Sequence, residues 1–199
     1  MNRMAYILGI DQGHSTTRAV VCRDDGVILG TGLAPGACHS THGMGQAMRS
    51  ITIAATNARG AAGLAAEPVE ILACGLTGAD WEDEYALLHG NVAQLGLSNQ
   101  VVIKNDSIIA LKGGTFSPYG AVIIAGTGGN CAVISPEGDE FVYHYYHDNY
   151  LQGGIALGRR ALDSIYRSAT GRMPATALTQ LVLDQYAFTA VDEPLSAEC

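Results

Sequence analysis

The sequence predicts an α/β fold, in which short apolar strands alternate with amphipathic helices. Apolar and β-branched runs end in clusters of glycine and polar residues, as at Ala5–Ile10, Val69–Cys74 and Ala121–Ala125. Between these runs, Met44–Ala58 places small and apolar residues at helical spacing. Trp81–Leu95 reads as a second helix, because its first turn is acidic and so suits the positive end of the helix dipole.

Further elements follow from the same patterns. Strands are expected at Arg18–Cys22, Val27–Gly30 and Val101–Lys104, and helices at Ser107–Lys112, Ile155–Ser168 and Ala175–Tyr186. Ala34–Ser40 is expected to be a loop. Tyr143–Tyr150 is aromatic and polar, and its His144 and His147 indicate a partly exposed strand rather than a metal site.

Composition bounds the class of protein. The chain has 199 residues, of which 48% are hydrophobic and 15% charged, which suits one globular domain or two small ones. A net charge of −8 argues against nucleic acid as a partner but leaves nucleotides open. No run reaches the ~18 apolar residues of a membrane span, and the N-terminal run is too short for a signal peptide. We therefore expect a cytoplasmic protein with no membrane partner.

The cysteine pattern predicts reduced thiols rather than a disulfide framework or a zinc site. No C-x-x-C pair occurs, and three of the five cysteines lie in strand-like runs. The five are Cys22, Cys38, Cys74, Cys131 and Cys199.

A weak internal repeat divides the chain. ILGIDQGHSTTRAVVCRDDGVIL and VIIAGTGGNCAVISPEGDEFV both read as strand, polar glycine turn, strand, acidic glycine turn and strand. Two such units suggest two related lobes, each with a phosphate-binding turn. Chance similarity between two hairpins is the alternative, since hairpins are common.

The stretch Val101–Ile134 carries the strongest chemical signal. Asn105 and Asp106 end one apolar strand, and a glycine-rich turn at Gly126–Asn130 ends the next. A carboxylate can accept a hydroxyl proton and bare backbone N–H groups can hold phosphate, so this stretch predicts a phosphoryl-transfer site. The alternative for Asp106 is an N-cap of the helix that follows it.

Four motifs in order resemble the N-acetylglucosamine kinase and BadF/BadG/BcrA/BcrD ATPase family. That family belongs to the actin-like, sugar-kinase and Hsp70 ATPase superfamily. IIAGTGGNCAVISPEG resembles its second phosphate loop, and Asn105-Asp106 its T-D-A segment. Leu76–Asp80 resembles its L-S-G segment, and Gly158–Leu162 its G-R-x-A-L helix. The resemblance runs from about Ala5 to Tyr166 and implies the ribonuclease H-like actin/sugar-kinase ATPase fold.

The resemblance also implies a domain plan. Residues 1–117 would form a complete N-terminal lobe with the first phosphate loop and the catalytic aspartate. Residues 118–199 would start a second lobe that carries the second phosphate loop but lacks the family's adenosine motif. We therefore expect a second lobe that is only partly present, in a truncated chain or one completed by another subunit. Apolar surface left exposed in this way should drive association, and a homodimer is expected.

Roles for single residues come from the resemblance. Asp106 would be the general base that takes a proton from the sugar C6 hydroxyl, and Asp11 would hold Mg²⁺ through water. Phosphate contacts are implied for Gly13, Ser15, Thr16, Thr127 and Gly128, and sugar contacts for Asn130, His39 and Asp148, beside Asp106 itself. Two alternatives stay open, a turn-forming role for Asp11 and a positive-φ turn position for Asn130.

The implied activity is ATP-dependent phosphorylation of N-acetylglucosamine or glucosamine, with ATP and Mg²⁺. Two departures bear on this activity. Gln12 and His14 interrupt the family's G-G-G-T turn, which brings it closer to the D-Q-G-T-T turn of glycerol-kinase-like enzymes. The family's acidic sugar loop aligns with Tyr150–Gly154, which holds no acid unless Asp148 shifts into place. Hexosamine specificity is therefore open.

Two other functions compete with the kinase. One is a catalytically silent sugar- or nucleotide-binding module on the same fold. The other is a dehydratase-activating ATPase, which holds an iron–sulfur cluster between subunits and needs closely placed cysteines. Cys131 stands alone near the second phosphate loop, which disfavours this last function.

Overall fold

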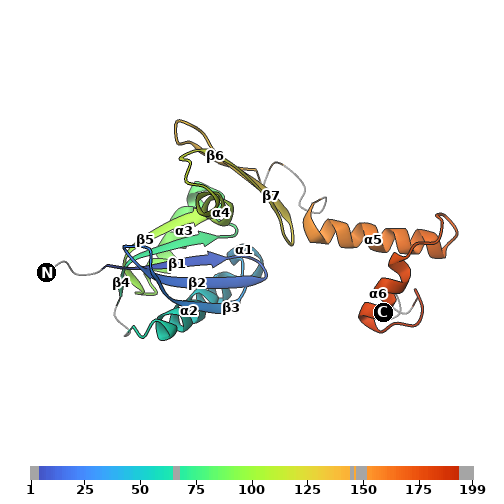
Figure 1. Ribbon diagram of the computed structural model, residues 1–199, viewed down its shortest axis with the longest axis horizontal. Helices are drawn as coiled ribbons and strands as arrows, with labels where there is room; N and C mark the ends of the chain where they lie inside the picture. Colours follow the sequence, from blue (N-terminus) through green and yellow to red (C-terminus); the bar gives the residue numbers. More distant parts are fainter. Residues whose placement is uncertain (1–4, 65–67, 144–145, 147–151, 193–199) are drawn as a thin grey trace. The chain divides into compact units, whose positions relative to one another are not determined.

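The computed structural model describes residues 5–64, 68–143, 146 and 152–192. The chain forms two compact units, one of Met1–Ile124 with Asn130–His147 and the other of Ala125–Gly129 with Asp148–Cys199. Most of the β-structure lies in the first unit (Figure 1). The predicted lobes of residues 1–117 and 118–199 stay a prediction.

A mixed five-stranded sheet forms the centre of the first unit (Figure 1). Its strands are β1 (Tyr6–Gln12), β2 (Thr16–Arg23), β3 (Ile28–Pro35), β4 (Val69–Leu76) and β5 (Ser98–Asn105), in the order β3-β2-β1-β4-β5. β1 to β3 form an antiparallel meander, whereas β4 runs parallel to both β1 and β5. The carboxyl ends of β1, β4 and β5 therefore meet at one edge of the sheet.

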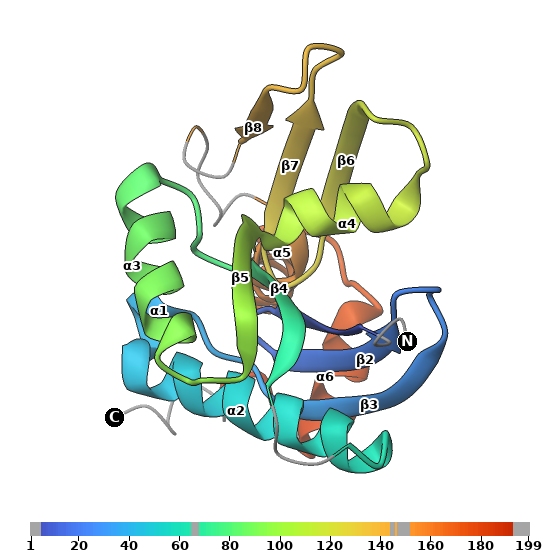
Figure 2. The ribbon, with the colours of Figure 1, turned by 90° about the vertical axis from the view of Figure 1, so that its left-hand side faces the viewer.

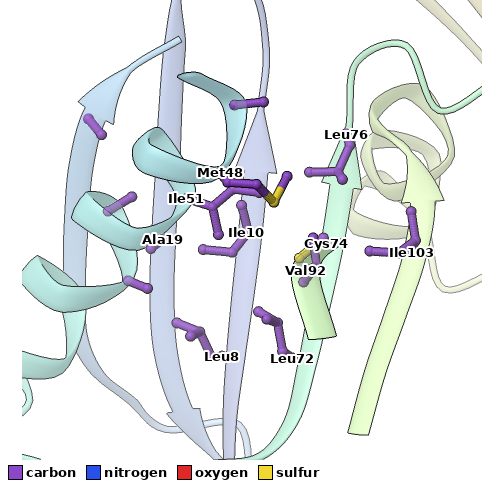
Figure 3. Close-up of a cluster of buried hydrophobic side chains, with 14 of the residues drawn as sticks. Leu8, Ile10, Ala19, Met48, Ile51, Leu72, Cys74, Leu76, Val92 and Ile103 are labelled. Carbon is purple, nitrogen blue, oxygen red and sulfur yellow. The ribbon is translucent and has the colours of Figure 1, made fainter. Parts of the chain in front are cut away.

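The helices of this unit are α1 (His39–His42), α2 (Met44–Ala61), α3 (Glu82–Ala93) and α4 (Asp106–Gly114). α2 packs against β2 and β3, and its Met48 and Ile51 meet Leu8, Ile10 and Ala19 of the sheet in the main core (Figure 3). The approach is close because Gly32 carries no side chain: a Cβ there would lie 2.1 Å from the carbonyl oxygen of Ala54.

A second, three-stranded sheet contains β6 (Gly120–Ala125), β7 (Gly129–Ile134) and β8 (Glu140–Val142), in that order. Figure 2 shows α4 between this sheet and the ends of β4 and β5. Ile108 and Leu111 of α4 form a small core with Ala132 and Ile134. Both repeat units thus form the strand–turn–strand–turn–strand structure that the sequence predicts.

The second unit contains α5 (Gly153–Ala169) and α6 (Leu178–Tyr186). α6 begins three residues later than predicted from Ala175, and the hydroxyl of Thr176 accepts from the amide of Leu178 just before it. Among the described residues, none of the helices has the length and apolar character needed to cross a bilayer.

Two other local predictions need correction. Ala34 and Pro35, predicted in a loop, extend β3 because they pair with Thr17 and Thr16 of β2. The end of the predicted loop, His39 and Ser40, begins the short helix α1, whose turn forms as the carbonyl of Cys38 accepts two amide hydrogen bonds.

The four cysteines in the described part of the chain carry free thiols, as predicted: Cys22, Cys38, Cys74 and Cys131. Burial raises the pKa of the Cys74 thiol to about 12, so this thiol stays protonated and unreactive.

Candidate active site

The candidate site lies where the parallel strands end. β1 ends at Gln12, β4 at Leu76 and β5 at Asn105; polar turns follow β1 and β4, and α4 follows β5 directly. The amide of Thr77 donates to the carbonyl of Gln12 over 2.9 Å, which joins the turn after β4 to the first candidate phosphate turn. Ligand sites are common at such an edge, outside the carboxyl ends of parallel strands.

The first phosphate turn, between β1 and β2, is held from two sides. The amide of Gly13 donates to the carbonyl of Thr16 over 3.0 Å, and the amide of Ala37 donates to the carbonyl of Gly13 over 3.1 Å. Gly36 must lack a side chain here, because a Cβ would lie 2.4 Å from the amide nitrogen of Thr16. Ser15 and Thr16 are exposed at the turn. Because Gly13 has no side chain, a phosphate could approach its backbone closely. The N–H of Gly13 itself is already hydrogen-bonded to Thr16 within the turn.

The two residues that interrupt the glycine pattern have different environments. Gln12 is 1% exposed, and its side-chain amide donates to the carbonyl of Ala47 in α2 over 2.9 Å. His14 is exposed, and its Nδ1 lies 3.4 Å from the hydroxyl of Thr77. Gln12 is therefore part of the core, and His14 is the residue that changes the surface of the turn.

Asp11 lies within β1, opposite Arg18 of β2. Its carboxylate is partly exposed and lies 3.5 Å from the guanidinium of Arg18. The alternative of a turn-forming Asp11 is wrong, because the residue is paired within the strand. A partly exposed carboxylate beside the turn leaves room for a hydrated cation.

Asp106 is the first residue of α4, and its neighbour Asn105 caps the helix. The Oδ1 atom of Asn105 accepts from the amide of Ser107 over 2.9 Å, so the N-cap alternative for Asp106 is wrong. Burial raises the pKa of the Asp106 carboxyl to about 6; the amide of Ser107 opposes this, while the carboxylates of Asp11 and Asp80 add to it. Asp106 therefore has the electrostatic environment of a proton acceptor that works near neutral pH.

His39 is held inside the fold rather than presented to solvent. Its side chain is 9% exposed, and its Nε2 lies 3.7 Å from Oε1 of Glu84. The other oxygen of Glu84 accepts from the amides of Asp80 and Trp81 over 3.0 and 3.1 Å. Sequence reasoning missed this role of Glu84, although its place in the acidic first turn of α3 was visible. Together these contacts join the predicted sugar loop to the turn after β4.

Asn130 lies in β7 and is half-buried. Its Oδ1 accepts from the amide of Cys131 over 2.8 Å. The positive-φ alternative is wrong: of the non-glycine residues in the described ranges, Ala187 alone has a positive φ.

The second phosphate loop belongs to the same compact unit as α5 and is hydrogen-bonded to that helix. Its carbonyl groups accept hydrogen bonds from the first turn of α5, from Gly154 to Gly126 over 2.8 Å and from Ile155 to Thr127 over 3.1 Å. The amide of Gly126 also donates to the carbonyl of Gly128 over 3.0 Å. The loop that carries Thr127 and Gly128 is thereby fastened to the N-terminus of a helix.

Glycine is also required where α5 meets this loop. A Cβ on Gly153 would lie 2.4 Å from the carbonyl carbon of Gly128, and Gly153 has a positive φ of 71°. Asp148, His144 and His147 lie outside the described residues.

The model of the BadF/BadG/BcrA/BcrD ATPase family matches residues 8–144, more than half of the sequence. The chain belongs to this family. A relative from Clostridium acetobutylicum, an N-acetylmuramic acid/N-acetylglucosamine kinase, is 28% identical over 186 residues. That similarity covers 91% of this chain and 60% of the relative, so the chain spans only part of the relative's length.

Solved structures agree on the fold. A candidate N-acetylglucosamine kinase from Chromobacterium violaceum superposes with a TM-score of 0.74 at 23% identity, covering 91% of this chain and 64% of that one. A ROK family glucokinase from Streptomyces griseus, in complex with glucose and AMPPNP, gives 0.61 at 20% identity, with 84% and 63% covered. The predicted actin-like and sugar-kinase ATPase fold is confirmed.

Proposed function

We propose that this chain acts in ATP-dependent phosphorylation of an amino sugar at its C6 hydroxyl. The observation that carries the proposal is the half-buried carboxyl of Asp106, at the end of β5 and with a pKa raised to about 6. Membership of the family and the similarity to a kinase for N-acetylmuramic acid and N-acetylglucosamine support the substrate class.

The proposed reaction needs a base and little covalent chemistry from the protein. Asp106 takes the proton of the sugar hydroxyl, and the hydroxyl oxygen forms a bond to the γ-phosphorus of ATP. The bond between that phosphorus and its bridging oxygen breaks, and ADP leaves with the electron pair. At neutral pH a carboxyl with a pKa of about 6 is mostly ionised and ready to accept the proton.

The first turn and Asp11 would face the phosphates. Gly13, Ser15 and Thr16 are proposed to contact phosphate oxygens, as are Thr127 and Gly128 of the second loop. Mg²⁺ prefers oxygen ligands and keeps several waters, which fits the partly exposed carboxylate of Asp11. No group of three acidic, cysteine or histidine side chains in the described ranges could hold a metal ion. A bound Mg²⁺ would therefore share its coordination with phosphate oxygens, and it would offset their charge.

The sugar contacts proposed for Asn130, His39 and Asp148 rest on the family resemblance. The small exposed fraction of His39 makes it a residue that shapes the sugar loop as much as one that touches sugar. Homodimer formation and a cytoplasmic location also stay predictions.

A coupled ATP-consumption assay on the 199-residue chain tests the proposal. N-acetylglucosamine, N-acetylmuramic acid, glucosamine and glucose are compared, with wild-type protein and Asp106→Asn. We expect sugar-dependent turnover that Asp106→Asn abolishes and that Asp24→Asn, in the exposed turn after β2, leaves intact. Sugar-independent or absent turnover from folded protein would contradict the kinase and favour the silent binding module.

A further inference from the structure

Asn105 is an unusually well-connected buried residue. It is 1% exposed and lies where β5 ends and α4 begins. Its Oδ1 accepts from both the amide and the hydroxyl of Ser107. Its Nδ2 donates to the carbonyl of Ala79 over 3.2 Å and to Oδ1 of Asp80 over 2.5 Å, and its own amide donates to the hydroxyl of Tyr85 over 3.2 Å. One side chain thus joins β5, α4 and the turn after β4.

The partner carboxylate, Asp80, is itself held in place. The amides of Asp80 and Trp81 donate to Oε2 of Glu84, which fixes the backbone of the turn. Asp80 therefore projects from a constrained turn towards the start of α4. Its charge and that of Asp11 both act on Asp106, from the turn after β4 and from β1 respectively.

Capping alone does not account for Asn105. A cap needs a side-chain oxygen that accepts an N2 or N3 amide, and Asp or Ser supplies one as well as Asn does. Only Asn combines this oxygen with an N–H₂ group that can donate to the carbonyl of Ala79 and to Asp80. The N–H₂ group of Asn105 therefore indicates a second role, which is to hold the carboxylate of Asp80.

We propose that Asn105 and Asp80 are a positioning pair, which fixes the carboxylate of Asp106 for proton transfer from the sugar hydroxyl. The inference rests on the proposed function, because it assigns the pair a task in that reaction. Asn105 sets where α4 starts and so where Asp106 lies. The hydrogen bond from the Asn105 amide holds the carboxylate of Asp80 against the residue that precedes Asp106.

Three variants test the pair: Asn105→Asp, Asp80→Asn and the double variant. Asn105→Asp keeps a good N-cap but sets two carboxylates against each other in place of a charge-assisted hydrogen bond. We expect kcat to fall roughly 10- to 100-fold, with the sugar KM nearly unchanged. The double variant exchanges the two groups, so the new amide at position 80 can donate to the new carboxylate at position 105. Its kcat should rise roughly three- to tenfold above that of Asn105→Asp but stay below wild type, because the carbonyl of Ala79 still faces a carboxylate oxygen instead of an N–H group.

A second readout does not need turnover. The ¹³C shift of the Asp106 carboxyl carbon is followed against pH in the same four proteins. The pKa of Asp106 should fall in Asp80→Asn, rise in Asn105→Asp and move back towards the wild-type value in the double variant. Asp80→Asn keeps every capping bond of Asn105, so it gives this measurement even if Asn105→Asp fails to fold.

The outcomes separate the two proposals. Absence of sugar-dependent turnover in wild type, with Asp106 titrating as described, would overturn the kinase but leave the pair acting on Asp106. Wild-type kcat and an unchanged Asp106 titration in Asn105→Asp would show a cap and nothing more. A double variant no better than Asn105→Asp would likewise overturn the pair.

Discussion

The two repeat units make the same hairpins but pack them differently. In the five-stranded sheet, which contains the first repeat unit, α2 packs so closely that Gly32 of β3 faces the backbone of Ala54. In the three-stranded sheet, which forms the second repeat unit, α4 covers one face. The other face of that sheet exposes apolar side chains: Ile123 is 84% exposed, and Val133 and Phe141 are also exposed. Local sequence therefore determines the hairpin, whereas burial of a sheet face depends on segments far along the chain.

The largest expected effect comes from comparing a buried residue beneath the five-stranded sheet with an exposed residue of the three-stranded sheet. Ile51→Ala removes a fully buried side chain from α2 and should lower the free energy of unfolding by roughly 2–5 kcal/mol, because it leaves a cavity. The matched change Ile123→Ala, on the exposed face of β6, should cost less than about 0.5 kcal/mol. Urea denaturation followed by circular dichroism measures both. A large loss from Ile123→Ala would mean that this face is covered in solution.

A second pair tests the close approach of α2. Gly32→Ala places a Cβ against backbone atoms of the helix and should destabilise the protein by roughly 1–3 kcal/mol. Gly60→Ala, within α2, meets no atom within 4 Å and should stabilise the helix by roughly 0.5–1 kcal/mol. The same denaturation experiment applies, and equal effects of the two changes would argue against close packing at Gly32.

The third test concerns α4, which both regions contact. The pKa of Asp106 is raised to about 6 in the folded protein, above the value of ~3.9 expected for an unfolded chain. The stabilisation from protonated Asp106 is thus complete below about pH 4 and lost as the pH rises through about 6. Asp106→Asn cannot ionise, so it should exceed wild type in stability at pH 7.5 by about 1–2 kcal/mol.

Stability at two pH values decides this prediction. The advantage of Asp106→Asn should shrink towards zero at pH 4, where folded wild-type Asp106 is protonated. An advantage that is equal at pH 4 and pH 7.5 would show that ionisation of Asp106 is not its cause. In the kinase assay, kcat of wild type should rise with pH through about 6 as the base loses its proton.

Much of this fold follows from local signals. The strands at Ala5–Ile10, Val69–Cys74 and Val101–Lys104 and the helix from Met44 are present, because apolar periodicity and glycine punctuation act within each segment. The predictions at Ala34-Pro35 failed because strand pairing with β2 overrides the turn preference of proline and glycine.

The site was only partly predictable. Asp106 was found through its motif, but which residue capped α4 could not be read from Asn105-Asp106, since either side chain can cap. The roles of Asn105, Asp80 and Glu84 depend on contacts between β5, the turn after β4 and α3, and a linear pattern does not encode those contacts. In the sequence Gln12 interrupts the glycine motif of the first phosphate turn, but in the structure it is buried against α2 and has a packing role.

The parallel pairing of β1, β4 and β5 has a consequence for the order of folding. The β1–β3 meander needs only short turns and can form from neighbouring segments, whereas β4 must return to β1 across the whole of α2. Such non-local contacts form slowly, because the entropy of closing the intervening chain is lost before they stabilise it. Asp11, Asp80 and Asp106 come together only through this parallel pairing, so the acidic environment of the base is a property of the finished domain. A folding intermediate with the meander alone would hold Asp106 at the pKa of an ordinary aspartate, and titration of Asp106 during refolding would report completion of the sheet.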